Sequence, residues 1–247
     1  MLAVSDRLPV SARESSLRIR FQSVITTQLT IPTWLDLLAV TANALFGALI
    51  GVRAKFDAAG ILALGILTGV GGGILRDILL NQVPTSISNP WFIIAALISA
   101  ILVALLARRL SRLAVLLLIC DAAALSLFGV TGAKKALAFG VSPVPAIFIG
   151  LIAGLGGGII CDMMTTKPPK VFKPGHLKVR TAFIGLVLYV LAVHFGAPAN
   201  LTGGIAILAI FGLRVINPDN DWKGSAGQPA VQPTGAPDGI PKEHGPD

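Results

Sequence analysis

Long apolar runs, separated by short polar or charged segments, dominate the pattern of this chain. They occupy residues 34–52, 58–80, 91–107, 113–133, 144–165, 181–197 and 201–216. Each is close to the roughly 20 residues that a helix needs to cross the hydrocarbon core of a bilayer. The runs are continuous and do not alternate, as the strands of a membrane barrel would. The pattern therefore predicts an all-α integral membrane protein with seven transmembrane helices.

The composition strengthens this prediction and leaves little room for a soluble domain. The chain has 247 residues, of which 54% are hydrophobic and only 13% are charged, whereas a soluble domain carries about 25% charged residues. A polar segment precedes the first run, and a segment rich in Pro and Gly with few apolar residues follows the last, which is typical of disorder. The predicted division is an N-terminal extension 1–32, a first three-helix unit 33–112, a second three-helix unit 113–199, a seventh helix 200–217 and a disordered tail 218–247.

The formal net charge of +8 reflects membrane topology better than a nucleic-acid partner, and none is expected. Most lysines and arginines between the helices fall in the loops after the first, third and fifth runs. Because basic loops stay in the cytoplasm, this bias predicts an N-terminus outside the cell and a C-terminus in the cytoplasm. The arginines of the N-terminal extension argue the other way and are outvoted.

A glycine motif occurs twice in the chain. Gly71-Gly72-Gly73-Ile74-Leu75-Arg76-Asp77 returns 85 residues later as Gly156-Gly157-Gly158-Ile159-Ile160-Cys161-Asp162. The same offset relates Asp36 to Asp121. A small gap is expected to bring Phe46-Gly47 opposite Phe128-Gly129. Each copy then contains three helices, and this odd number of crossings predicts an inverted-topology repeat with the seventh helix outside it.

Two interpretations of the glycines remain open. Three consecutive glycines cost a helix about 1 kcal/mol each relative to alanine, so they need a physical reason. A face of small residues lets membrane helices pack closely. Alternatively, the helices bend or unwind there and expose backbone carbonyls to a wet cavity, the one place where such backbone is tolerated at membrane depth. Interruptions at matching positions of two inverted halves favour the second interpretation and a solute or ion pathway.

Charged residues in or near the apolar runs also have two interpretations. The acids Asp36, Asp77, Asp121 and Asp162 either cap helices and form internal pairs, for example with Arg76, or set the cation preference of a polar pathway. Lys134 and Lys135 fit an interfacial position better than the pore, although Lys135 is kept as a pore candidate. The sixth and seventh helices look plain. Scattered histidines and two cysteines indicate no metal site, and no cofactor is expected.

These residues resemble the prokaryotic branch of the trimeric intracellular cation (TRIC) channel family, whose repeated unit is also called a glycine transporter domain. The resemblance covers residues 34–216 and rests on the paired glycine motifs and on Gly132-Ala133-Lys134-Lys135-Ala136. It implies a homotrimer in the cell inner (plasma) membrane, with one potassium-permeable pore in each subunit. The resemblance also implies that the bent second and fifth helices line that pore. Residue by residue it points to Gly71, Gly72, Gly73, Arg76, Asp77, Gly156, Gly157, Gly158 and Asp162.

The sequence departs from the family pattern at Cys161, where the second motif usually has arginine. This loss removes a cation beside Asp162 and makes the two halves electrostatically unequal. The leading hypothesis is passive, potassium-selective cation conduction. The alternative is a secondary transporter of a small zwitterion such as glycine, which inverted repeats with broken helices suit equally well. Nothing indicates energy coupling, because the chain has no nucleotide-binding loop. An enzyme is not expected, because the chain has no serine–histidine pairing, no set of zinc ligands and no clustered-aspartate motif for phosphoryl transfer.

Overall fold

The described part of the chain is entirely helical, as the sequence predicts. A computed structural model describes residues 33–106, 113–166 and 177–216, and no strand occurs among them. The predicted extension 1–32, the tail 218–247 and most of the basic loop residues lie outside this part. The helices are α2 (Thr33–Arg53), α3 (Ala58–Leu79), α4 (Thr85–Ser88), α5 (Pro90–Leu106), α6 (Leu113–Ala138), α7 (Pro143–Met164), α8 (Leu177–His194) and α9 (Ala199–Ile216).

Five of these helices, α2, α3, α6, α7 and α9, are long and apolar enough to cross a membrane. Helix α5 is equally apolar but has only 17 residues. Helix α8 carries Lys178, Arg180 and His194 and is not among the helices that are long and apolar enough to cross a membrane. The outer faces are apolar, for example at Leu105, Phe148 and Leu208, and a surface of this kind is suited to lipid. The chain is therefore a multi-pass membrane protein, while the count of seven crossings stays a prediction.

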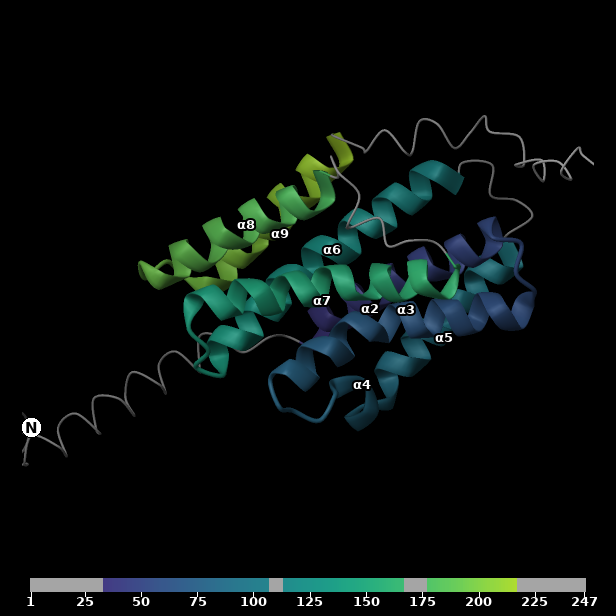
Figure 1. Cartoon of the computed structure of the whole chain (residues 1–247), viewed down its shortest axis with the longest axis horizontal. Helices are drawn as coiled ribbons and strands as arrows, with labels where there is room; N and C mark the ends of the chain where they lie inside the picture. The colour runs from purple at the N-terminus through teal and green to yellow at the C-terminus, as the bar shows by residue number, and fades with distance from the viewer. Residues whose placement is uncertain (1–32, 107–112, 167–176, 217–247) are drawn as a thin grey trace, which may run out of the picture.

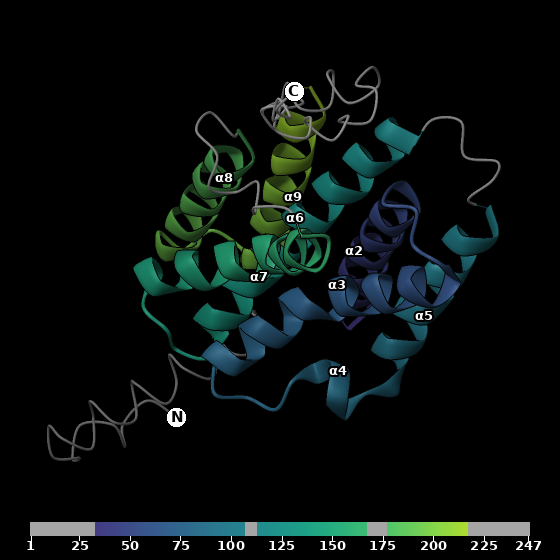
Figure 2. The same cartoon turned by 45° about the vertical axis from the view of Figure 1, so that its right-hand side comes forward.

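Four helices form the centre of the molecule. Helix α2 packs against α3 and α6, and α7 packs against α3 and α6. Helices α4 and α5 lie on one side of this centre, whereas α8 and α9 lie together on the other (Figure 1; Figure 2). Arrangements of this kind bury small residues between helices, and Ala39, Ala44, Ala48, Ala133 and Ala153 are all fully buried.

Helices α3 and α7 contact each other through their glycines. A Cβ on Gly72 would overlap the carbonyl oxygen of Ala153, and one on Gly157 would lie 2.7 Å from the carbonyl oxygen of Thr68. Gly156 is equally close to Leu75, at 2.6 Å from its Cδ1 atom. Backbones approach this closely only where side chains are absent. The glycines therefore serve close packing.

Of the predicted bending or unwinding at these glycines, the unwinding does not occur. Both α3 and α7 are continuous α-helices through the motif, and the only glycines with positive φ in the described residues are Gly140 and Gly196. Each central glycine packs against a neighbouring helix, so the dense contacts compensate for the low helix propensity of glycine. The left-handed residues stand after the helices instead, at Asn81 (φ 53°) and Thr166 (φ 55°), which again are 85 residues apart.

The same offset holds across α2 and α6 without any gap. Gly47 lies against Thr68 and Leu64, whereas Gly132 lies against Ala153 and Ile149, and each of these is 85 residues further along. Gly129, by contrast, lies against Leu186 and Gly150. These contacts favour a register that pairs Gly47 with Gly132 over the predicted pairing of Phe46-Gly47 with Phe128-Gly129.

Candidate functional site

The first half of the molecule holds a buried ion cluster on α2 and α3. Arg76 binds Asp36 through two parallel hydrogen bonds, from Nη1 to Oδ1 at 3.0 Å and from Nη2 to Oδ2 at 3.1 Å. Its Nε donates to Oδ1 of Asp77 at 2.8 Å. Arg76 and Asp77 are each 1% exposed and Asp36 is 6% exposed. A planar guanidinium is the cation best suited to such a two-pronged carboxylate contact.

Asp77 joins this cluster to α4 and to α6. Its Oδ2 accepts hydrogen bonds from the backbone nitrogen and the hydroxyl of Thr85, both at 2.8 Å. Its Oδ1 also accepts from Nζ of Lys135 at 2.9 Å, and Lys135 donates further to the Thr85 hydroxyl at 3.2 Å. One carboxylate therefore ties together the end of α3, the start of α4 and the last turns of α6.

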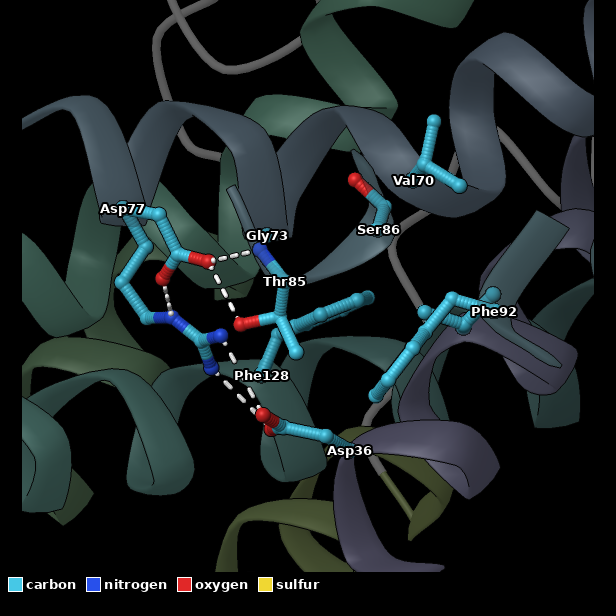
Figure 3. A pocket seen from close by; sticks show the side chains of 10 residues that line it. Asp36, Val70, Gly73, Asp77, Thr85, Ser86, Phe92 and Phe128 are labelled. Atoms are coloured by element: carbon cyan, nitrogen blue, oxygen red, sulfur yellow. Dashed lines mark hydrogen bonds and ion pairs between the residues drawn. The ribbon is translucent and has the colours of Figure 1, made fainter. Parts of the chain in front are cut away.

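A small pocket lies beside this cluster (Figure 3). Asp36 and Asp77 stand at opposite sides of the guanidinium, and Thr85 lies next to the Asp77 carboxylate. The rings of Phe92 and Phe128 form an apolar wall of the pocket. Charged groups at membrane depth persist when they pair with one another, and here Arg76 and Lys135 pair with the two carboxylates.

The second half lacks the corresponding arginine and supplies its cations differently. Cys161 stands at that position and is fully buried. Asp121, which corresponds to Asp36, forms ion pairs with Nζ of Lys178 on α8 and, at 3.4 Å, with Nη2 of Arg214 on α9. Because Arg76 binds Asp36 as well as Asp77, the arginine missing from the second half concerns Asp121 as well as Asp162. Asp162 is half-buried and has a partner of its own.

The third glycine of each motif faces a different group. A Cβ on Gly73 would lie 3.5 Å from Cε1 of Phe128, whereas one on Gly158 would lie 3.3 Å from Nζ of Lys178. The Lys178 ammonium also lies 5.7 Å from the centre of the Phe46 ring. An aromatic ring therefore borders α3 at the position where an ammonium borders α7.

The structure brings together Asp36, Arg76, Asp77 and Lys135, and it places Asp121 in a separate cluster. Lys135 is half-buried and Lys134 is buried, with its Nζ 2.6 Å from the side-chain oxygen of Asn200. Both lysines therefore lie inside the bundle. Whether the acids, the glycines and Lys135 line a pore stays a prediction.

Sequence reasoning missed Thr85, Lys178 and Arg214. The view of the seventh helix as plain is wrong, since Arg214 is 2% exposed in its last turn. An arginine inside an apolar run is itself a sign of an internal partner and was available from the sequence. Lys178 carried no such sign, because it stands in a loop-like basic segment and only the packing of α8 brings it to Asp121.

Comparisons with known proteins agree with this arrangement. A sequence model of a family described as "Glycine transporter" matches residues 33–108 and again residues 118–194. A UPF0126 membrane protein of Deinococcus radiodurans is 39% identical over 181 residues, which cover 72% of this chain and 84% of that protein. The UPF0126 inner membrane protein YadS of Escherichia coli is 31% identical over 183 residues, which cover 72% of this chain and 88% of YadS.

Solved structures share the fold. The TRIC trimeric intracellular cation channel orthologue of Rhodobacter sphaeroides superposes with a TM-score of 0.70 and 34% sequence identity, covering 74% of this chain and 95% of that one. A prokaryotic TRIC channel gives a TM-score of 0.69 and 26% identity over 74% of this chain and 93% of its own. Sequence and structure agree, and the chain belongs to the trimeric intracellular cation channel family.

Proposed function

We propose that this protein is a passive, potassium-selective channel for monovalent cations, with a pore in each subunit lined by α3 and α7. The observation that carries the proposal is the pair of buried ion clusters, Asp36–Arg76–Asp77–Lys135 and Asp121–Lys178–Arg214, beside the contact of two glycine helices. The likeness to TRIC channel structures supports the assignment to cations.

The first cluster has the chemistry that a monovalent cation needs. The Lys135 ammonium is held by a carboxylate oxygen of Asp77 and the hydroxyl of Thr85. Potassium takes oxygen ligands of the same kind, and rings of acids or oxygens give channels their cation preference. Movement of the Lys135 side chain would free these oxygens for a passing ion, with Arg76 still neutralising part of the negative charge.

We further propose an inverted repeat in which the residues of α2 and α3 correspond to those of α6 and α7 at the offset of 85. The reciprocal contacts Gly72–Ala153 and Gly157–Thr68 support it. The proposed assembly is a homotrimer in the inner membrane, as in the trimeric relative of Rhodobacter sphaeroides. The proposed orientation has the N-terminus outside and the C-terminus in the cytoplasm, and the bias of the loop charges supports it.

The experiment that tests the proposal is ion flux through the purified protein in liposomes. Potassium, sodium, chloride and labelled glycine are compared, with protein-free liposomes as the control. A channel gives potassium flux that grows with concentration without saturating and exceeds chloride flux. Saturable glycine uptake that depends on a proton or sodium gradient, without such potassium flux, would refute the proposal and make the protein a transporter.

A further inference from the structure

We propose that Lys178 supplies, from α8, the cation that the second glycine motif lacks, and that its ammonium is a specificity-determining charge on the α7 side of the pathway. The specificity role of Lys178 rests on the proposed channel function, whereas the replacement of the missing cation does not. The replacement concerns one contact, between the Lys178 ammonium and the Asp121 carboxylate.

The buried Asp121 carboxylate needs a cationic partner. Asp121 is 4% exposed and stands on α6 where Asp36 stands on α2. An ionised carboxylate at this depth needs a cation within reach. In the first half the next helix, α3, provides it through Arg76, but α7 offers the neutral Cys161. Lys178 and Arg214, from two helices outside this pair, make the contacts instead.

The Lys178 ammonium lies at the glycine motif of α7. Nζ of Lys178 stands next to Gly158, at 3.3 Å from a Cβ placed there, and over the ring of Phe46. The position is therefore at the face of the third glycine of α7. Its counterpart, Gly73, faces the uncharged ring of Phe128. An ammonium thus borders the third glycine of α7, whereas an aromatic ring borders the third glycine of α3.

The Lys178 side chain is held less firmly than the Arg76 side chain. Arg76 is fixed by three hydrogen bonds and is fully buried. Lys178 has a flexible stem, and its side chain is 13% exposed against 2% for Arg214. A compact ammonium on a flexible stem changes partner easily. Lys178 can therefore leave Asp121 while Arg214 remains, so the charge beside Gly158 is a movable one.

Lys178→Met tests the electrostatic role, because it keeps the apolar stem and removes the charge. Like charges a few ångströms apart repel even in water, so we expect the single-channel potassium conductance to rise severalfold. Lys178→Arg, which keeps the charge, should stay near the wild-type value. Arg180→Met is the matched control, since Arg180 is an exposed cation on the same helix. An unchanged conductance of Lys178→Met, in protein that is folded and trimeric, would overturn this role.

A double-mutant cycle in thermal stability tests the replacement itself and needs no conduction. Cys161→Arg alone should lower the melting temperature, because it places a third cation near Asp121 in a packed site. Lys178→Ala alone should also lower it, because Asp121 then keeps only Arg214. The double variant should melt higher than the sum of the two effects predicts, since one cation replaces the other. Additive effects would overturn the proposal.

The two possible failures are distinguishable. A wild-type protein that conducts no cation would refute the channel function and with it the specificity role of Lys178, while the stability cycle would still decide whether Lys178 replaces the missing arginine. A conducting wild type with an unchanged Lys178→Met variant would refute the specificity role alone.

Discussion

The two halves of this molecule neutralise a buried aspartate with different cations. Asp36 on α2 is neutralised by Arg76 on the neighbouring α3. Asp121 on α6 faces Cys161 on the corresponding α7 and takes its cations from α8 and α9. The glycine contacts between the halves are nevertheless equivalent, Gly72 with Ala153 and Gly157 with Thr68. Packing symmetry is therefore kept while charge symmetry is lost.

The difference between packing and charge separates the role of the glycines from the role of the cation in the motif. Gly72 and Gly157 cannot gain a side chain without moving two backbones apart, so both halves have glycine at this position. A cation can change its place in the chain as long as it reaches the same carboxylate. One consequence is that Asp36 depends on one arginine, whereas Asp121 has two cationic partners.

The largest expected effect comes from removing that one arginine. Arg76→Met leaves Asp36 and Asp77 without their shared cation, and breaking a buried pair in this way costs about 3–5 kcal/mol in free energy of unfolding. Lys178→Met should cost clearly less, because Arg214 still pairs with Asp121. Unfolding in detergent by heat or denaturant measures both. Equal losses in the two variants would contradict this difference between Asp36 and Asp121.

The exposed Arg180 provides the control for this comparison. Arg180→Met should change the free energy of unfolding by no more than about 0.5 kcal/mol, as surface substitutions usually do.

The next effect tests the packing symmetry. Gly72→Ala places a Cβ against the carbonyl oxygen of Ala153, and overpacking of this kind costs about 1–3 kcal/mol. Gly73→Ala is its matched control, because the nearest atom would be Cε1 of Phe128 at an ordinary 3.5 Å. The gain in helix propensity should then make it neutral or stabilising by up to about 1 kcal/mol. Melting temperatures of the two variants, measured side by side, decide the matter. Equal destabilisation would mean that the glycines do not act through this contact.

The third prediction concerns the acids of the two motifs. Asp77→Asn removes the charge that holds Lys135 and Thr85, and a pathway that passes this carboxylate should lose cation preference. We expect a severalfold fall in the permeability of potassium relative to chloride, measured from reversal potentials. Asp162→Asn makes the same change in the second half and should act in the same direction. Unchanged reversal potentials in both variants would remove these acids from the pathway.

The smallest effect belongs to a contact found in one half alone. Asn43 on α2 donates from Nδ2 to the carbonyl oxygen of Thr68 at 2.7 Å and is buried. At the offset of 85 its counterpart is Phe128. Asn43→Ala should lower the free energy of unfolding by about 0.5–1.5 kcal/mol, the usual net value of one hydrogen bond. A melting temperature equal to that of the wild type would show that this bond contributes nothing to stability.

The sequence reveals the periodic features of this protein better than its long-range ones. Continuous apolar runs predict the helices, and the repeated glycines predict where two of them meet. The sequence left two interpretations of Gly71–Gly73 open, close packing and a bent or unwound helix, and favoured the second, because helix propensity alone does not show that Ala153 lies against Gly72. In the structure the helix is continuous there. The tertiary contact outweighs the local cost.

Side-chain partners were harder to predict than helices. The bond from Arg76 to Asp77 follows from adjacency, but the stronger contact with Asp36 joins residues 40 positions apart. Lys178 and Arg214 lie 57 and 93 positions from Asp121. A repeat predicts such contacts only where both copies keep the same residue, and at Cys161 they do not.

The most direct test of the proposed potassium-selective conduction is the reversal potential of the wild-type protein in a planar bilayer under a gradient of potassium chloride. This proposal predicts unitary currents that reverse close to the potassium equilibrium potential. Currents that reverse near zero or near the chloride equilibrium potential would contradict it, as would the absence of unitary currents together with saturable uptake of glycine.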